Sequence, residues 1–258
     1  MIMWVESHPT PAIAFMMFGF WYVVALLLLA VTTYFSNRPI AADLRLVTPV
    51  LLTPLAVITG LLIAFLSARV WANLDHADAD VAQEANGLHE AALFADLLPA
   101  DTRDAVHASI RRYLHFVDAK DWPAMAEGRA SLQPVPPPLV EAMRTLFAFV
   151  PAGPNQVLAQ ERAIAAIDTV VSARRERVLL SQPVVAPLQW AVIVILGVLL
   201  LLTLALVHID QRRTAATGIF ILATALAACL LLLAVNDRPF ASGGNTIEPA
   251  FLHQLGLD

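Results

Sequence analysis

The residues whose types and spacing could carry chemistry stand closest together in the stretch "LDHADAD" at positions 74–80. Asp75 and Asp78 would share one face of a helix, as would His76 and Asp80, and Glu84 follows one turn later. Such side chains can bind a divalent cation, but a continuous helix cannot wrap oxygen ligands around an ion as a loop does. The pattern therefore favours a solvated acidic face without a bound metal, and a vestibule whose acidic face attracts ions is the alternative.

Enzymatic chemistry has no support elsewhere in the chain. The sequence contains no nucleophile motif, no paired-histidine zinc motif, no kinase signature and no glycine-rich phosphate loop. Cys229 is the single cysteine, so no disulfide framework is possible within the chain. No basic stripe with interleaved aromatic residues points to nucleic acid. We therefore predict a protein that is not an enzyme, needs no cofactor and binds no nucleic acid.

The elements that position these residues are dominated by apolar runs. Hydrophobic residues make up 59% of the chain and charged residues only 14%, whereas a soluble domain carries roughly 25% charged residues. Residues 13–35, 47–66, 187–207 and 215–235 contain no Asp, Glu, Lys or Arg, and a helix of about 20 residues crosses a bilayer core. No Lys or Arg precedes the first run, so it is a retained helix and not a secretory signal. We predict an integral membrane protein with four transmembrane helices.

The segment between the second and third runs has the periodicity of packed helices. Leu74, Val81, Leu88 and Ala95 recur every seven residues, so one stripe of a helix faces a partner. We therefore expect a long helix that leaves the second span, a few shorter helices, and a long helix that returns to the third span. The predicted organisation is all-α: a first transmembrane pair at 1–66, a helical domain at 67–186, a second transmembrane pair at 187–235 and a tail at 236–258.

The second apolar run differs from the other three in composition. Pro49 and Pro54 remove backbone hydrogen bonds inside a span, which is tolerated where the backbone faces protein or water. Thr53, Ala56 and Gly60 lie with Pro49 in a narrow arc of small or weakly polar residues. Such a stripe lets helices approach closely, and it could equally line a pore in an oligomer. The spacing favours helix packing over a pore lining and leaves both readings open.

Three segments, in this order, resemble the bacterial bestrophin-like family of four-span membrane proteins, which is similar to the bestrophin ion channels. They are "TPLAVITGLLIAFLSARVW" at positions 53–71, "WPAM" at 122–125 and "DRPF" at 237–240. Bestrophins are pentameric and mostly anion-conducting, with the termini and the middle domain in the cytoplasm. The resemblance therefore implies a homo-oligomer, a pentamer, in a prokaryotic inner membrane, with both termini and the helical domain cytoplasmic.

The resemblance also assigns roles to residues of the second span. The family's neck is lined by three residues at four-residue steps, and the corresponding positions are Thr53, Val57 and Leu61. Rings of apolar side chains can gate ions by dewetting. The residues that flank this neck are Pro54, Ala56, Gly60 and Ala64. This neck is less bulky than is usual in the family, which often has Phe there, so we expect a wider or wetter ring.

The end of the last span is expected to connect the tail to the helical domain. Asp237 and Arg238 mark the exit from lipid, Pro239 stops the helix, and Phe240 anchors the tail. Animal bestrophins place an acidic calcium clasp after this point. Here Glu248 is the only acidic residue before the final Asp258, so calcium gating through such a clasp is not expected.

These observations together predict an oligomeric ion channel of the lipid bilayer. Because the family favours anions, an anion is expected ahead of a monovalent cation, although an acidic vestibule would attract cations. The alternative function is a non-conducting membrane scaffold or sensor whose helical domain binds a protein partner.

Overall fold

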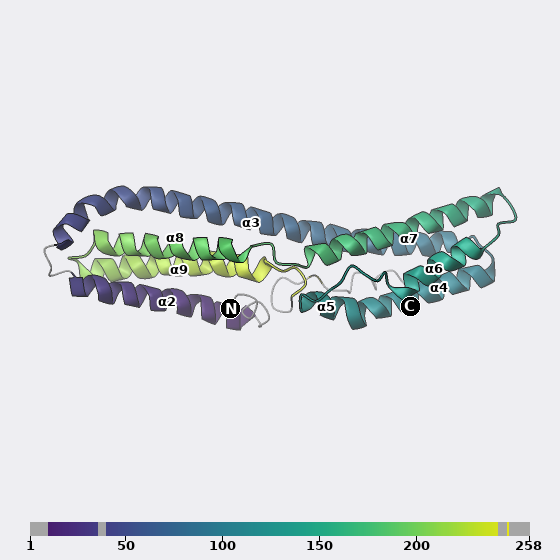
Figure 1. Ribbon diagram of the computed structural model, residues 1–258, viewed down its shortest axis with the longest axis horizontal. Coiled ribbons are helices and arrows are strands. Elements are labelled where there is room, and N and C mark those ends of the chain that lie inside the picture. The colour runs from purple at the N-terminus through teal and green to yellow at the C-terminus, as the bar shows by residue number, and fades with distance from the viewer. Residues whose placement is uncertain (1–9, 36–39, 242–246, 248–258) are drawn as a thin grey trace. The chain divides into compact units, whose positions relative to one another are not determined.

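The computed structural model describes residues 10–35, 40–241 and 247, and within them every regular element is a helix (Figure 1). The chain divides into two compact units. Of the described residues, those up to 72 and from 183 to 238 form the first, which we call the membrane unit, and those from 73 to 182 and after 238 form the second, the helical domain. This is the predicted all-α architecture, with a helical domain inserted between the second and third spans.

The membrane unit contains four helices that are long and apolar enough to cross a bilayer. They are α2 (Thr10–Phe35), the first part of α3 (Ile40–Ala95), α8 (Pro187–Val207) and α9 (Arg212–Asn236). Helices α2, α8 and α9 lie side by side (Figure 1). The core between them is apolar, with Trp21, Ile193 and Ile219 fully or almost fully buried. The four predicted spans are therefore confirmed as helices of sufficient length.

A close approach in this unit depends on a glycine. A Cβ atom built on Gly197 of α8 would lie 2.4 Å from the Cη2 atom of Trp21 on α2. Any side chain at this position would therefore collide with the indole ring that fills the core.

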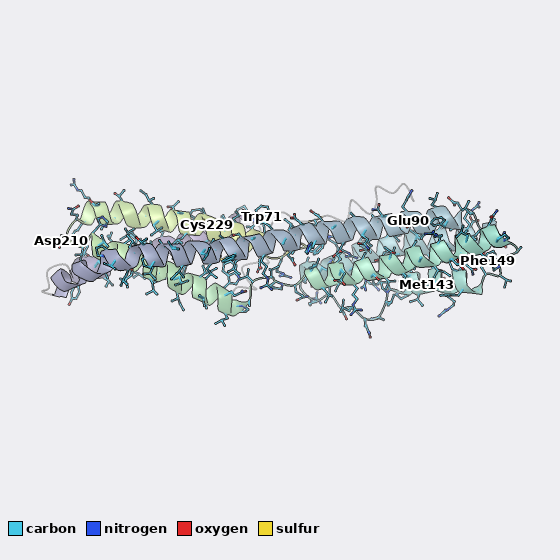
Figure 2. All side chains as sticks on the ribbon, turned by 90° about the horizontal axis from the view of Figure 1, so that it is seen from above. Trp71, Glu90, Met143, Phe149, Asp210 and Cys229 are labelled. Atoms are coloured by element: carbon cyan, nitrogen blue, oxygen red, sulfur yellow. The ribbon has the colours of Figure 1, made fainter. Side chains whose placement is uncertain are left out.

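Asp210 lies in the turn between α8 and α9 (Figure 2).

The helical domain begins with the second part of α3, which continues from the membrane unit without a break. It is followed by α4 (Ala100–Phe116), a π-helical turn η1 (Val117–Asp121), α5 (Trp122–Ala126), α6 (Pro137–Ala148) and α7 (Pro154–Leu180). Phe149 follows α6 at the turn that leads to α7 (Figure 2). The helices that enter and leave the domain, α3 and α7, are the two long ones, as predicted.

The heptad stripe of α3 forms part of the core of this domain. Leu74, Val81, Leu88 and Ala95 are all buried, as their seven-residue spacing predicts. On the same helix a Cβ atom at Gly87 would lie 2.9 Å from the Cγ2 atom of Val170 on α7. The stripe and the glycine together bring α3 and α7 close enough for charged groups of the two helices to meet.

Candidate functional site

The predicted neck residues lie on a face of α3 that has no partner within the described part of the membrane unit. Val57 is 60% exposed and Leu61 is 54% exposed, and Thr53 is exposed as well. Leu66 and Val70 of the same helix are 4% and 1% exposed and pack into the core of the unit. Val57 lies nine residues before Leu66, and Leu61 lies nine residues before Val70. Nine residues make about two and a half helical turns, which places the two members of each pair on opposite sides of α3. The predicted neck therefore faces away from the packed side of α3.

The residues expected to flank the neck are exposed on the same stretch of helix: Pro54, Ala56, Gly60 and Ala64. A Cβ atom on Gly60 would meet no atom within 4 Å, so nothing in this chain requires a glycine there. Pro49 and Pro54 are accommodated inside a continuous helix and do not divide it. Because proline has no N–H, the carbonyl group of Val50, four residues before Pro54, lacks its usual intrahelical donor. A polar backbone group is thus available beside the neck.

The acidic stretch of α3 is not a single solvated face. Asp75 and Asp78 are exposed and Asp80 is partly exposed, but Glu84 has an exposed fraction of 0%. The prediction of a shared acidic face is therefore wrong for Glu84. No group of three or more metal-ligating side chains occurs among the described residues. Of the four acids in this stretch, the three aspartates remain accessible to solvent.

Glu84 belongs instead to a buried network of ion pairs between α3 and α7. Its carboxylate accepts hydrogen bonds from Nε and Nη2 of Arg177 at 2.6 Å and 3.0 Å. The hydroxyl of Tyr113 on α4 donates to the same carboxylate at 2.6 Å. Asp121, at the end of η1, lies 3.6 Å from Nη2 of Arg177 and accepts two further hydrogen bonds from Arg174 at 2.6 Å and 2.9 Å. Two carboxylates thus neutralise two guanidinium groups, of which the Glu84–Arg177 pair has no solvent exposure and the Asp121–Arg174 pair almost none.

Burial and neighbouring charges shift the pKa values of two members of this network, Tyr113 and Arg177. Burial raises the pKa of Tyr113 well above its usual range, and the charge of Glu84 raises it further. Burial alone would lower the pKa of Arg177, but the Glu84 carboxylate and the Tyr113 hydroxyl raise it above its ordinary value. Tyr113 therefore remains a neutral hydrogen-bond donor and Arg177 remains a cation at physiological pH.

The "WPAM" segment, which carries part of the family resemblance, lies against Arg177. The guanidinium Cζ atom lies 4.7 Å from the centre of the Trp122 ring, and Nη1 is 3.3 Å from Sδ of Met125. Phe240 packs edge-on against Trp122 with ring centres 5.4 Å apart. The indole N–H of Trp122 donates to the carbonyl oxygen of Ile247 at 3.2 Å. Trp122 and Met125 of the "WPAM" segment are therefore packed against a buried cation, and Phe240 covers the Trp122 ring.

Residues 236–239 terminate α9. This helix ends at Asn236, before Pro239, whose ring disfavours helical conformation in the preceding residue. Asp237 is fully buried, and its Oδ1 atom accepts hydrogen bonds from the backbone N–H groups of Val184 and Val185 at 3.0 Å and 2.8 Å. Asp237 therefore ties the end of the fourth span to the segment that enters the third. The region expected to lack a calcium clasp, including Glu248, lies outside the described residues.

Sequence reasoning missed Arg177, Asp121 and Tyr113 as members of a common network. One available signal was the position of Glu84, which lies seven residues from both Ala77 and Ala91, on a line of small residues. Both alanines have exposed fractions of 0%. An acid on such a line is expected to be buried and therefore paired, but its partner lies 93 residues away and local spacing does not reveal it.

Comparison with known proteins identifies the family and the fold. The sequence matches the Bestrophin-like domain family over residues 19–252, which is most of the chain. The fold matches the crystal structure of a bacterial bestrophin homologue from Klebsiella pneumoniae with a TM-score of 0.70. That match covers 94% of this chain and 96% of that chain at 11% sequence identity, so it bears on the fold alone. Curated protein sequences gave no match. The chain is a multi-pass membrane protein that belongs to the bestrophin-like family.

Proposed function

We propose that this chain forms an oligomeric ion channel whose pore is lined by α3, with a neck at Thr53, Val57 and Leu61. The observation that carries the proposal is the exposure of this face on the side of α3 that points away from the core. One helix cannot enclose a pore, but copies of it arranged around an axis can, as in the pentamer that the family resemblance implies. The exposed face then becomes the wall of the pore.

The chemistry of this face suits a gate that works by hydration. Val57 and Leu61 are one helical turn apart and would form two successive apolar rings, which exclude hydrated ions when the passage is narrow. Thr53 would add a weakly polar ring at one end. The carbonyl group that Pro54 leaves without a helical donor is costly in lipid but can be hydrated in a pore. These features favour an aqueous passage over a surface covered by lipid.

Selectivity in this proposal does not come from the neck itself, because none of its residues is charged. We propose an anion channel, following the family's preference, with a monovalent cation as the alternative. The structure reduces the acidic charge available to attract cations, since Glu84 is neutralised by Arg177 and faces the core. The exposed charges that remain on this stretch belong to Asp75, Asp78 and the partly exposed Asp80.

The proposed location is a prokaryotic inner membrane, with the termini and the helical domain in the cytoplasm. Both the orientation and the pentameric state rest on the resemblance to bestrophins.

Cysteine accessibility tests the pore assignment. Cys229 is first replaced by alanine to remove the only native thiol, and cysteine is then introduced at Val57, at Leu61 or at Ile221. Ile221 on α9 is 66% exposed and serves as a matched apolar control outside the proposed pore. We expect a membrane-impermeant thiol reagent to modify Val57→Cys and Leu61→Cys in liposomes and to leave Ile221→Cys unmodified. Equal protection of all three would refute the pore assignment.

Ion flux tests conduction independently. Protein reconstituted in liposomes is given a chloride gradient and a potassium gradient in turn, and Val57→Ala and Leu61→Ala are compared with the native chain. We expect chloride flux that increases in both variants, since smaller rings leave a wider and wetter neck. Flux of potassium alone would overturn the anion assignment. Accessible neck cysteines in a protein that conducts neither ion would instead favour a non-conducting scaffold or sensor.

A further inference from the structure

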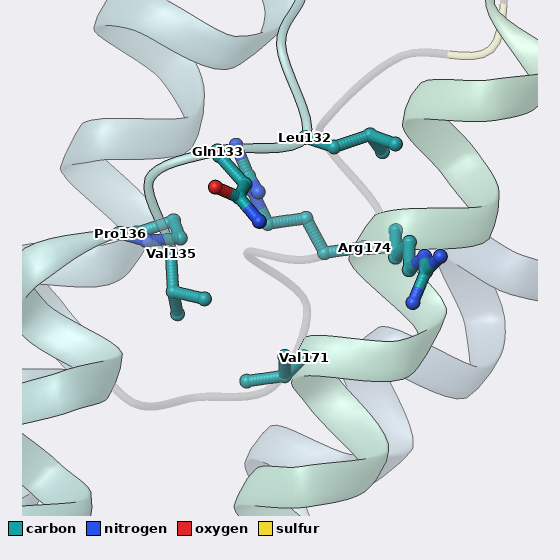
Figure 3. Close-up of a pocket in the computed structure, with 7 residues that line it drawn as sticks. Leu132, Gln133, Val135, Pro136, Val171 and Arg174 are labelled. Carbon is teal, nitrogen blue, oxygen red and sulfur yellow. The ribbon is translucent and has the colours of Figure 1, made fainter.

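A cavity of about 220 Å³ lies within the helical domain, apart from the proposed pore face. One wall is the irregular segment between α5 and α6, and the other is α7 (Figure 3). Leu132, Val135 and Pro136 form apolar surface on the first wall, and Val171 does so on the second. The volume is below the roughly 300–1,000 Å³ of sites that hold drug-sized ligands. A ligand of this cavity is therefore small and has an apolar body.

The described residues of the cavity wall carry one positive charge that is not paired with another described residue. Arg174 and Arg175 both line the cavity. Arg174 is almost fully buried and is neutralised by the two hydrogen bonds that it donates to Asp121. Arg175 is exposed and makes no ion pair or hydrogen bond with the described residues. None of the described residues that line the cavity is acidic, so Arg175 is available to a single negative charge.

A neutral polar group lies beside these apolar residues. Gln133 lines the cavity from the irregular segment, opposite Val171 and Arg174 (Figure 3). The hydrogen bonds of this residue with Ser131 use its backbone atoms, and its side-chain amide makes none with the described residues. The amide can therefore donate to an acceptor oxygen of a ligand, and it adds no charge.

We propose that this cavity binds a small organic monocarboxylate with an aliphatic or aromatic body. A carboxylate matches the planar guanidinium of Arg175 and can accept from Gln133, while its hydrocarbon part fills the space beside Val135 and Val171. Inorganic phosphate offers no apolar body to these walls, and a cation is repelled by Arg175. This site is independent of ion conduction, and its test does not depend on the pore assignment.

Calorimetric titration of the full-length protein in detergent provides the test, with benzoate as the probe. Benzyl alcohol supplies the same ring without the charge, and inorganic phosphate supplies charge without the ring. We expect saturable binding of benzoate at one site per chain and binding of the other two probes at least about tenfold weaker, since a hydrogen bond to a charged group is worth about a factor of ten or more. No saturable binding of benzoate, or equal binding of benzyl alcohol, would overturn the proposal.

Three variants distinguish the cavity from general attraction to a basic surface. Arg175→Gln is expected to weaken benzoate binding about tenfold, and Val171→Phe is expected to abolish it by filling the cavity. Arg162→Gln is the matched control, because Arg162 is an exposed arginine on the same helix that does not line the cavity. A loss at Arg162→Gln equal to that at Arg175→Gln would refute the site. Arg175→Gln changes an exposed residue, so it remains decisive if Val171→Phe does not fold.

Discussion

Replacing Arg177 by methionine removes the cation that joins both carboxylates of the buried network while leaving a flexible chain of similar length on Trp122. The lost contacts are two hydrogen bonds to Glu84 at 2.6 Å and 3.0 Å and the approach to Asp121 at 3.6 Å. Glu84 would then keep only the hydrogen bond from Tyr113 in a position with no solvent exposure. The perturbation therefore leaves a buried carboxylate without a counter-charge.

The size of the effect follows from that burial. Removing one partner of a buried ion pair costs about 3–5 kcal/mol, because the remaining charge is uncompensated. A folded domain is stable by only about 5–15 kcal/mol in total, so the variant should lose a large part of its free energy of unfolding. Adding Glu84→Gln removes the stranded charge and keeps a hydrogen-bonding partner for Tyr113. The double variant should therefore be more stable than Arg177→Met alone.

The measurement is urea unfolding of the purified protein in mild detergent, followed by circular dichroism and by tryptophan fluorescence. The matched control is Arg112→Met, which breaks the ion pair between Arg112 and Glu141 at 3.0 Å in the same domain. Those side chains are 52% and 49% exposed, and exposed pairs contribute about 0–1 kcal/mol. If Arg177→Met costs no more than Arg112→Met, or if Glu84→Gln destabilises it further, the network does not stabilise the domain as argued.

Three further outcomes are expected in the helical domain. Burial raises the pKa of Tyr113 in the folded state, so only the unfolded chain loses this proton as the pH rises past about 10. The free energy of unfolding should therefore fall by up to about 1.4 kcal/mol per pH unit above that point. Tyr113→Phe should reduce that fall in urea unfolding at alkaline pH, and an unchanged slope would contradict the assignment. Gly87→Ala should lower the melting temperature, because the new Cβ atom would lie 2.9 Å from Cγ2 of Val170. A higher melting temperature would mean that α3 and α7 have room to separate. Phe240→Ala should expose Trp122 to water and shift its fluorescence emission to longer wavelength, whereas unchanged emission would show that the tail does not cover this ring.

The parts of the fold that could be predicted from sequence are those in which local spacing decides the outcome. An apolar run of about 20 residues has few alternatives to a membrane span, and the seven-residue spacing of Leu74, Val81 and Leu88 requires a buried helical stripe. The existence of four helices long enough to span a bilayer and the burial of this stripe follow from such patterns, whereas the end predicted for the second span at residue 66 does not appear, because α3 continues to Ala95.

The buried network could not be predicted in the same way, because it depends on which helices meet. Glu84 and Asp80 are both acids on one helix, yet Glu84 is fully buried while Asp80 is partly exposed. The difference arises from Arg177, which reaches Glu84 only after α7 has packed on α3. Spacing along one helix contains no information about that partner. The exposed neck face has the related difficulty that the pore which it is proposed to line is completed only by other copies of the chain.

The separation of Glu84 from Arg177 has a consequence for biosynthesis. The two residues are 93 positions apart, and synthesis at about 5–20 residues per second leaves the carboxylate without its guanidinium for roughly 5–20 seconds. Throughout that interval α3 carries an acid without its counter-charge on the side that later becomes core. A hydrated Glu84 opposes collapse of this side onto a wrong partner until α7 arrives. A nascent chain that stops before Arg177 should therefore remain open and accessible to proteases, and a cell could clear such fragments before they assemble.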